Sequence, residues 1–339
     1  MSLTHVAPAS AGSSGAAASL LAVEGLTIAP RAASDRPLVA DVAFTLGRGE
    51  ALGVVGESGC GKSLTCLAIT GLLPRALLRT AGRVALEGTR IERLAPDALA
   101  VVRGRRIGMI FQDPVASLNP VRTIGAFLTS LLRRHRGLQG EAARREAVRL
   151  LDAVGVAAAR TRLRLYPHEL SGGQNQRVMI AGALAGEPDV LLADEPTTAL
   201  DVTTQAQILD LLADLRATRG MALVVVSHDF GVIAAAADRV VVMYAGRVVE
   251  EAPVADLFRA PRHPYTAGLM ASVPPETGRA PLRPLLGQPP HTGAAVVGCA
   301  FAPRCVRASD ACRETTPALV QLGRRRVACR HPLPGERVS

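Results

Sequence analysis

Gly56-Glu57-Ser58-Gly59-Cys60-Gly61-Lys62-Ser63 is the most informative stretch of the chain. The five residues before it, 51–55 (ALGVV), are apolar throughout and predict a buried strand. After it, residues 62–73 have the pattern of a helix that ends before Pro74. A glycine-rich turn between a strand and a helix gathers backbone N–H groups at the positive end of the helix dipole. The sequence therefore predicts an anion-binding turn.

Lys62 is the only lysine among the 39 Lys and Arg residues. Because arginine serves at every other basic position, this site is expected to need a compact ammonium that a planar guanidinium cannot replace. Gly-x-x-x-x-Gly-Lys-Ser also matches the P-loop pattern, in which backbone N–H groups enclose a nucleotide phosphate. We expect Lys62 to reach the β- and γ-phosphates and Ser63 to be a Mg²⁺ ligand.

Two adjacent carboxylates follow a second apolar run. Residues 190–193 (VLLA) predict a buried strand, and Asp194 and Glu195 come directly after it. Such a pair often forms only a solvated loop, but beside a phosphate-binding loop it is typical of a Mg²⁺ ligand followed by a general base. We expect Asp194 to hold Mg²⁺ and Glu195 to polarise an attacking water.

The composition is typical of a folded protein without a membrane-spanning segment. The 339 residues are 48% hydrophobic, and no apolar run reaches the roughly 18 to 20 residues that a membrane helix needs. Residues 1–20 lack the basic start and apolar centre of a secretory signal, and we expect them to be a disordered tail of a cytosolic protein. The net charge of +10 could indicate nucleic acid or an anionic membrane surface, but the arginines are scattered along the sequence.

The order of the patterns predicts an α/β fold. Residues 19–46 alternate short apolar runs with turn residues, which indicates a β-rich opening section. Runs rich in β-branched residues at 190–193, 223–226 and 240–243 predict strands of a mainly parallel sheet. Helical patterns separate these runs, as expected for a sheet with helices on its faces.

A helical insert is expected over about residues 113–167. One of its helices is predicted over 141–154. Its buried face is predicted to contain Val148, Leu151 and Val154, and the helix is predicted to stop at Gly155. After about residue 261 prolines become frequent and periodic segments rare, which predicts a small separate module.

Residues 170–174 (LSGGQ), followed by Gln176-Arg177, resemble the signature of ABC ATPases. The resemblance extends in order and spacing from residue 21 to about residue 254. It implies a P-loop NTPase fold, with an ABC ATPase domain over 21–260 that contains a β-rich N-terminal section and a helical subdomain. A cysteine-containing extension would follow over 261–339. It also implies that residues 56–63 bind ATP.

The same resemblance assigns roles to three further positions. Gln112 would be the Q-loop glutamine, which ligates Mg²⁺ and assists catalysis, and Ala199-Leu200-Asp201 would form the D-loop. A lone histidine after a core strand is more often structural, but Ser227-His228-Asp229 lies at the position of the catalytic switch histidine. In this family an aromatic residue usually stacks on adenine, and this sequence has Pro30 there.

Residues of the signature are expected to act on a second subunit. Ser171 and the glycine amides at a helix start form an anion site that faces outward, away from the P-loop of the same chain. Two such subunits, identical or homologous, would pair head to tail with ATP between them. The residues that would complete the partner's ATP site are Ser171, Gly172, Gly173, Gln174 and Asp201.

Segments around the core resemble the ATPases of oligopeptide and dipeptide importers, a group with nickel and glutathione relatives. They are residues 111–114 (FQDP), 117–120 (SLNP) and 263–266 (HPYT). The resemblance implies a peripheral ATPase on the cytoplasmic face of the membrane, with two permease subunits and, indirectly, a solute-binding protein as partners. Two alternatives stay open: a nucleic-acid-associated ABC ATPase, and a metal-regulated soluble ATPase without a transport role. Nucleic acid is not expected.

Four cysteines are clustered near the C-terminus: Cys299, Cys305, Cys312 and Cys329. A cytosolic chain seldom keeps disulfides, so four clustered thiols suggest a metal site. Their spacing lacks the Cys-x₂-Cys pairs of ordinary structural zinc. Resemblance to the extension of peptide-importer ATPases favours a [4Fe–4S] cluster, with zinc and metal-free thiols as alternatives. Cys66, by contrast, is expected to be buried in the helix after the P-loop.

Overall fold

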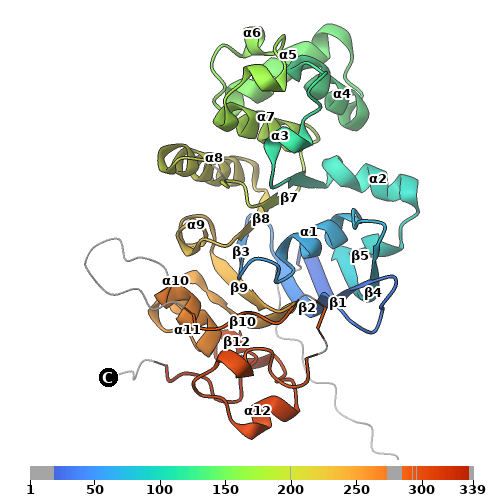
Figure 1. Ribbon diagram of the computed structural model, residues 1–339. Helices are drawn as coiled ribbons and strands as arrows, with labels where there is room; N and C mark the ends of the chain where they lie inside the picture. Colours follow the sequence, from blue (N-terminus) through green and yellow to red (C-terminus); the bar gives the residue numbers. More distant parts are fainter. Residues whose placement is uncertain (1–18, 199, 273–284, 292, 295, 336–339) are drawn as a thin grey trace, which may run out of the picture.

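The computed structural model describes residues 19–198, 200–272, 285–291, 293–294 and 296–335. Most of the predicted tail, residues 1–18, lies outside the described residues. A helical layer, a central sheet with its flanking helices and a C-terminal layer follow one another from top to bottom in Figure 1.

The main sheet contains eight strands in the order β11-β12-β10-β9-β3-β8-β7-β6. Neighbours from β9 to β6 pair in parallel, whereas β10, β12 and β11 pair antiparallel. The strands are β3 (Ala51–Val55), β6 (Ile107–Ile110), β7 (Val190–Asp194), β8 (Ala222–Ser227), β9 (Arg239–Tyr244), β10 (Arg247–Pro253), β11 (Val320–Leu322) and β12 (Arg325–Val327). This confirms the α/β fold and its mainly parallel core.

A second, antiparallel sheet forms the opening section in the order β2-β1-β4-β5. Its strands are β1 (Leu21–Pro30), β2 (Val39–Leu46), β4 (Leu77–Leu86) and β5 (Thr89–Arg90). The β-rich opening section is therefore confirmed.

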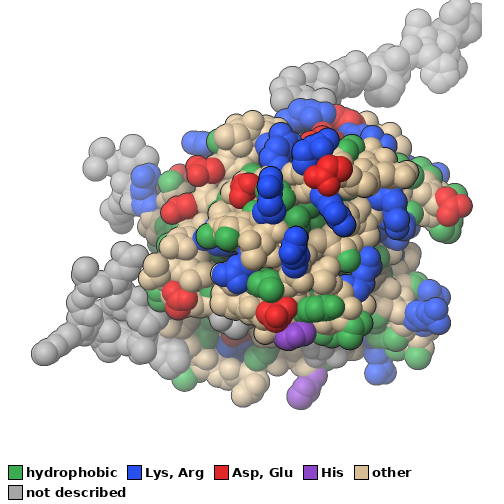
Figure 2. All heavy atoms as spheres, turned by 90° about the horizontal axis from the view of Figure 1, so that it is seen from above, with side chains coloured by type: hydrophobic (Ala, Val, Ile, Leu, Met, Phe, Trp, Pro, Cys, Tyr) green, Lys and Arg blue, Asp and Glu red, His purple; other side chains and the backbone are tan. Residues whose placement is uncertain are grey.

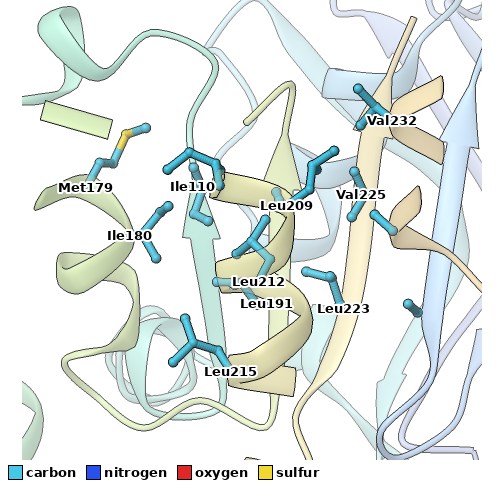
Figure 3. Packing of buried hydrophobic residues seen from close by; sticks show 14 of the residues in the cluster. Ile110, Met179, Ile180, Leu191, Leu209, Leu212, Leu215, Leu223, Val225 and Val232 are labelled. Atoms are coloured by element: carbon cyan, nitrogen blue, oxygen red, sulfur yellow. The ribbon is translucent and has the colours of Figure 1, made fainter. Parts of the chain in front are cut away.

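Buried central strands and the helices on them form the core. All residues of β3, β7 and β8 are buried, as expected for parallel strands covered on both faces. In Figure 3, leucines of α8 (Val202–Arg219) and side chains of α7 (Gly172–Leu184) pack together on the sheet. The labelled side chains from these three parts are Leu209, Leu212 and Leu215 of α8, Met179 and Ile180 of α7, and Ile110, Leu191, Leu223 and Val225 of the sheet. This packing fixes the helices that carry the site relative to the strands.

The expected insert contains α3 (Pro114–Ser117), α4 (Ile124–Arg136), α5 (Gly140–Ala153) and α6 (Ala159–Arg162). The predicted face of α5 is confirmed at Leu151 and Val154, which are completely buried, and needs a correction at Val148, which is only half-buried. The helix also buries Ala143, Ala147 and Leu150. Small alanines allow close packing, but their apolar surface is too small to mark a buried face in the sequence.

Helix α1 (Lys62–Thr70) also ends earlier than predicted. Gly71 adopts a left-handed conformation with φ 65° and its N–H caps the carbonyls of Leu67 and Ala68, so the helix stops before Pro74. Cys66 is buried in α1, as predicted. The other helices are α2 (Pro96–Arg105), α9 (Phe230–Ala236), α10 (Val254–Arg259), α11 (Pro264–Ala271) and α12 (Asp310–Glu314).

The C-terminal part is joined to the main sheet. Strand β12 pairs with β10, so that Glu250 lies opposite Val327 and Glu251 opposite Arg326. Residues 320–327, within the predicted C-terminal module, therefore extend the sheet of the ATPase core. Among the described residues, no helix is long and apolar enough to cross a membrane.

Candidate functional site

The predicted site residues follow the carboxyl ends of four neighbouring parallel strands. Strand β3 leads into the P-loop (residues 56–63), β7 ends at Asp194, and β8 is followed by His228. Gln112 comes two residues after β6. Since parallel strands place their carboxyl ends at one edge of the sheet, residues far apart in the sequence meet there.

The P-loop passes too close to its neighbours for side chains at two of its glycines. A Cβ on Gly56 would lie 2.2 Å from the Met243 carbonyl oxygen. At Gly61 the backbone is left-handed, with φ 103°, and a Cβ would lie 2.7 Å from Cγ2 of Val39. Gly61 is also the N-cap of α1 and makes no side-chain cap. The first amides of α1 are therefore not used by a capping side chain.

Lys62 lies inside the loop and is 5% exposed. Its Nζ donates hydrogen bonds to the carbonyl oxygens of Gly56, at 2.7 Å, and Glu57, at 3.1 Å. The ammonium is thus held at the centre of the loop by neutral acceptors. An anion in the loop would offer the same ammonium a charged acceptor, which makes stronger hydrogen bonds.

Ser63 and Asp194, the two residues predicted to hold Mg²⁺ from α1 and β7, are in direct contact. The Ser63 hydroxyl donates to Oδ1 of Asp194 at 2.9 Å. Burial raises the pKa of Asp194, while the bond from Ser63 opposes this rise and the neighbouring Glu195 adds to it. A hard cation between these oxygen ligands would favour the ionised carboxylate, so the pair fits a Mg²⁺ site.

Glu195 is the centre of a small hydrogen-bonded cluster. Its Oε2 accepts from Gln112 Nε2 at 3.0 Å and from Thr198 Oγ1 at 2.9 Å. Its Oε1 lies 3.3 Å from Nδ1 of His228. The structure therefore brings together the three side chains that the sequence predicts to be catalytic. Glu195 also has a left-handed backbone, with φ 49°, an uncommon conformation that clusters at functional positions.

The cluster keeps Glu195 ionised. Burial opposes ionisation, but the hydrogen bonds from Thr198 and His228 outweigh it and lower the pKa of Glu195. A carboxylate of this kind can accept a proton from water. Thr198 was not predicted as a site residue. It lies only three residues after Glu195 in the sequence, but its hydroxyl reaches the carboxylate only because the chain turns between them.

The signature residues lie at the exposed start of α7. Ser171 is the N-cap, and its Oγ accepts from the backbone N–H of Gln174 at 3.3 Å. In return, the Gln174 side chain accepts from the N–H of Ser171 at 3.1 Å. This capping box satisfies the helix start within the chain. In Figure 1, α7 belongs to the helical layer, whereas α1 lies beside the sheet below it.

Asp201 caps the next helix, α8. Its carboxylate accepts from the backbone N–H and the hydroxyl of Thr204, at 2.9 and 2.7 Å, and these bonds lower the pKa of Asp201. A Cβ on Gly173 would lie 2.9 Å from Cγ2 of the same Thr204. The signature and the start of α8 are therefore packed together. Ala199 of the expected D-loop lies outside the described residues.

All four C-terminal cysteines line one cavity, together with His263 and His331. The backbone N–H of Cys299 donates to the carbonyl of Cys312 at 2.7 Å. Burial raises the pKa of Cys329 to about 11, and the other three thiols contribute to the rise. In the described part of the chain, no three His, Cys, Asp or Glu side chains are arranged closely enough to hold a metal ion as they stand.

Pro30 occupies the position at which the resemblance implies an aromatic residue that stacks on adenine. Pro30 ends β1 and is opposite Leu77 of β4. Another cavity borders the P-loop and is walled partly by the C-terminal segment. Its lining includes Leu38, Ser58, Tyr244, Pro290 and His291. The surface next to the loop is thus built from both ends of the chain.

Arginines gather on the helical layer. The face in Figure 2, seen from above the molecule of Figure 1, shows Lys and Arg side chains in excess of Asp and Glu. A hollow between α4, α5 and α6 is lined by Arg144, Arg145, Arg160 and Arg164. These residues are exposed, and one acidic residue, Glu141, lines the same hollow.

Comparison with known proteins gives the family. Residues 39–198 match the model of the ABC transporter family, and residues 249–312 match that of the oligopeptide/dipeptide transporter C-terminal region. A relative from Brucella abortus (strain 2308), named as a peptide import ATP-binding protein, is 47% identical over 301 residues. That alignment covers 88% of this chain and 90% of the relative.

Two further relatives are named for oligopeptide and dipeptide transport. OppD of Mycobacterium tuberculosis (strain ATCC 25618 / H37Rv) is 46% identical over 316 residues, which is 91% of this chain but only 51% of that protein. DppD of Haemophilus influenzae (strain ATCC 51907 / DSM 11121 / KW20 / Rd) is 43% identical over 293 residues, or 86% and 89% of the two chains.

Solved structures agree on the fold. The ATP-binding cassette MJ0796, described as a dimer in a post-hydrolysis state bound to ADP and Pi, superimposes with a TM-score of 0.61 at 30% identity. The match covers 69% of this chain and 98% of the cassette. With the P-loop, the signature and the C-terminal region all matched in one chain, the protein belongs to the ATP-binding subunits of the oligopeptide/dipeptide ABC transporter family.

Proposed function

We propose that this chain hydrolyses ATP to drive the uptake of oligopeptides, dipeptides or related cargo through partner permeases. The observation that carries the proposal is the cluster of Gln112, Glu195 and His228 next to the contact between Ser63 and Asp194. The names of the relatives support peptides as the cargo class.

The P-loop amides and Lys62 would bind the phosphates, and Ser63, Asp194 and Gln112 would hold Mg²⁺, which neutralises phosphate charge when bound. Glu195 would accept a proton from the attacking water as the water oxygen bonds to the γ-phosphorus and the bond to the bridging oxygen breaks. His228 and Thr198 would keep the Glu195 carboxylate ionised and oriented.

Hydrolysis would need a second ATPase subunit, the same chain or a homologue. Ser171, Gly172, Gly173, Gln174 and Asp201 of one subunit would complete the ATP site of the other. Closure of this pair would move the helical layer against two membrane permeases and place the chain at the cytoplasmic face of the membrane. An extracytoplasmic solute-binding protein would deliver the cargo, and no nucleic acid is involved.

The C-terminal cysteines would hold a metal centre, by preference a [4Fe–4S] cluster and otherwise Zn²⁺. Their convergence on one cavity supports this, because thiolates are ligands for either metal. A small side-chain movement would be required, since the thiols are not in ligating positions as they stand. Replacing Cys305 and Cys312 by Ser should abolish a brown absorbance near about 400 nm in protein purified without oxygen. A colourless protein that contains zinc would instead establish the alternative.

The central test of the proposal is Glu195→Gln. The amide keeps the size of the side chain but cannot accept a proton, so ATP hydrolysis should fall by roughly 100-fold or more, while ATP binding persists. ATP should then hold the subunits in a closed dimer, which size-exclusion chromatography with ATP would detect. Phosphate release and nucleotide binding should be measured on the same preparation.

Glu187→Gln provides a matched control, because Glu187 is an exposed surface residue that also has a left-handed backbone, with φ 57°. Its turnover should equal that of the unmodified chain. Unchanged hydrolysis in Glu195→Gln would remove Glu195 from the role of base. If the unmodified chain does not bind ATP at all, the proposed function itself is wrong.

A further inference from the structure

A half-buried ion pair connects the P-loop with the C-terminal segment. Arg304, which directly precedes Cys305, donates from Nη1 to Oε2 of Glu57 at 2.8 Å and from Nη2 to Oε1 at 3.0 Å. The two residues are 247 positions apart in the sequence. The Arg304 side chain is only 4% exposed. A two-pronged contact of this kind fixes both the position and the orientation of the carboxylate.

The backbone of Glu57 is held from the same side. Its N–H donates to the hydroxyl of Tyr265 at 2.9 Å, across 208 positions of sequence. Tyr265 is completely buried and follows His263, which lines the cysteine cavity. Both contacts to Glu57 therefore start from residues next to that cavity.

An aromatic cluster supports the two contacts. Ring centroids of Tyr265 lie 4.5 Å from Tyr244 and 5.5 Å from Phe301. The guanidinium carbon of Arg304 is 5.8 Å from the ring centroids of both Tyr244 and Phe301. The whole chain has three Tyr, six Phe and no Trp. Two of these few rings, Tyr244 and Phe301, thus contact the arginine, and Tyr265 packs against both of them.

The charge of Glu57 explains why such support is needed. A free carboxylate in a loop that binds phosphates would repel them across a few ångströms of poorly screened space. The positive charge of Arg304 offsets the negative charge of the carboxylate, and the two hydrogen bonds keep the carboxylate from turning toward the phosphates. The carbonyl of the same residue accepts from Lys62 Nζ, so the position of Glu57 also sets where the ammonium lies.

We propose that Arg304 and Tyr265 are positioning residues of the ATP site, through which the cysteine-containing segment sets the affinity of the P-loop for ATP. The inference rests on the proposed function, since it takes residues 56–63 as the ATP site. It adds that an intact C-terminal segment is required for tight nucleotide binding, even though none of its residues needs to contact the phosphates.

The decisive comparison uses the full chain and three variants. Arg304→Gln leaves Glu57 charged and unpaired, so the Kd for ATP should rise roughly 10- to 100-fold. Adding Glu57→Gln to Arg304→Gln removes the repelling charge, and the double variant should recover most of the lost affinity. Arg304→Lys restores one point charge without the two-pronged contact and should give an intermediate Kd. ATP binding would be measured by calorimetry well below the melting temperature.

Two further variants separate positioning from general stability. Tyr265→Phe removes only the hydroxyl that accepts from Glu57 and should weaken ATP binding by a few-fold. Arg313→Gln is the matched control: Arg313 belongs to the same segment and pairs with the exposed Asp310 at 3.1 Å. Its Kd should equal that of the unmodified chain.

An unchanged Kd for ATP in Arg304→Gln would overturn the inference, as would a double variant no better than Arg304→Gln alone. If Arg304→Gln does not fold, equal ATP affinities of the unmodified chain, Arg304→Lys and Tyr265→Phe would overturn it instead. Failure of the proposed function is distinguishable, because in that case the unmodified chain would not bind ATP either.

Discussion

Helices α1 and α7 both begin at glycine-rich turns, but their first residues are in opposite situations. At α1 the N-cap is a glycine without a side-chain cap, and Lys62 beside it is buried. At α7 the N-cap Ser171 and Gln174 satisfy each other's backbone N–H groups, and the turn is exposed. Of these two helix starts, that of α1 is thus open for an anion and that of α7 is closed by its own side chains.

The difference indicates how a shared site can be divided between two subunits. An open, buried start is organised before the ligand arrives and loses little entropy on binding. A start with its own cap is stable in the free subunit, and in the proposed pair of subunits a phosphate bound by the partner would have to replace the cap. We therefore expect α1 to determine ATP affinity and α7 to determine whether the bound ATP is hydrolysed.

Lys62→Gln, at the start of α1, should have the largest effect on ATP binding. The variant removes the only positive side chain of the loop, and the Kd for ATP should rise by roughly 100-fold or more. Equilibrium binding of a fluorescent ATP analogue would measure this. Lys62→Arg tests the shape of the cation, and it should fail as well because the planar guanidinium cannot occupy the position of Nζ.

Gly172→Asp tests the α7 side and should separate binding from turnover. A Cβ at Gly172 would meet no atom within 4 Å, and an acidic residue in the first turn of a helix is favourable, so the melting temperature should not fall. The new charge would repel the partner's phosphate. ATP hydrolysis should drop by about 100-fold, while the Kd for ATP of the single subunit stays within twofold.

Gly172→Asn has nearly the same size without the charge and is the control for this variant. It should retain most of the hydrolysis. Equal losses of ATP hydrolysis in the Asp and Asn variants would mean that the size of the side chain at position 172, and not its charge, impairs hydrolysis. A weaker ATP affinity in Gly172→Asp would show that α7 contributes to binding in the single subunit, contrary to the comparison.

A third helix start, that of α11, gives the smallest expected effect. Its N-cap is His263, whose Nδ1 accepts from the N–H of Tyr265 at 3.0 Å. Burial lowers the pKa of His263 to about 4, so the folded protein keeps it neutral while the unfolded chain takes up a proton below about pH 6.5. The free energy of unfolding should therefore fall between about pH 6.5 and 4, by an amount on the order of 2 kcal/mol.

His263→Asn keeps an acceptor at the N-cap and removes the titration. Urea unfolding of both proteins at pH 7.5 and pH 5 would show a smaller loss of stability for the variant on acidification. Identical pH dependence would assign the acid sensitivity to other groups.

Local patterns were sufficient to predict most of the fold. Strand β3 and the P-loop were predicted because apolar runs and glycine spacing depend only on neighbouring residues. The predicted end of α1 was wrong because Gly71 caps the helix in a left-handed conformation. Any glycine can adopt this conformation, so residue type alone does not show which glycine ends the helix. On α5, the alanines that fill the interface carry too little apolar surface to stand out in the sequence.

The site was predictable where one motif contained the chemistry, as at Asp194-Glu195. Contacts between distant segments were not. Nothing near Glu57 in the sequence indicates Arg304 or Tyr265, because their meeting depends on the way the C-terminal segment returns to the sheet. The contact of Thr198 with Glu195 depends on the conformation of one turn. That turn contains the left-handed backbone of Glu195, which could not be inferred from residue type.

The pairing of β12 with β10 has a consequence for self-association. Strand β10 lies between β9 and β12 in the sheet, so a chain cut before residue 320 would expose a row of backbone N–H and C=O groups along an edge strand. Exposed edges of this kind pair with other molecules. We therefore expect the loss of β12 to favour self-association of the ATPase core.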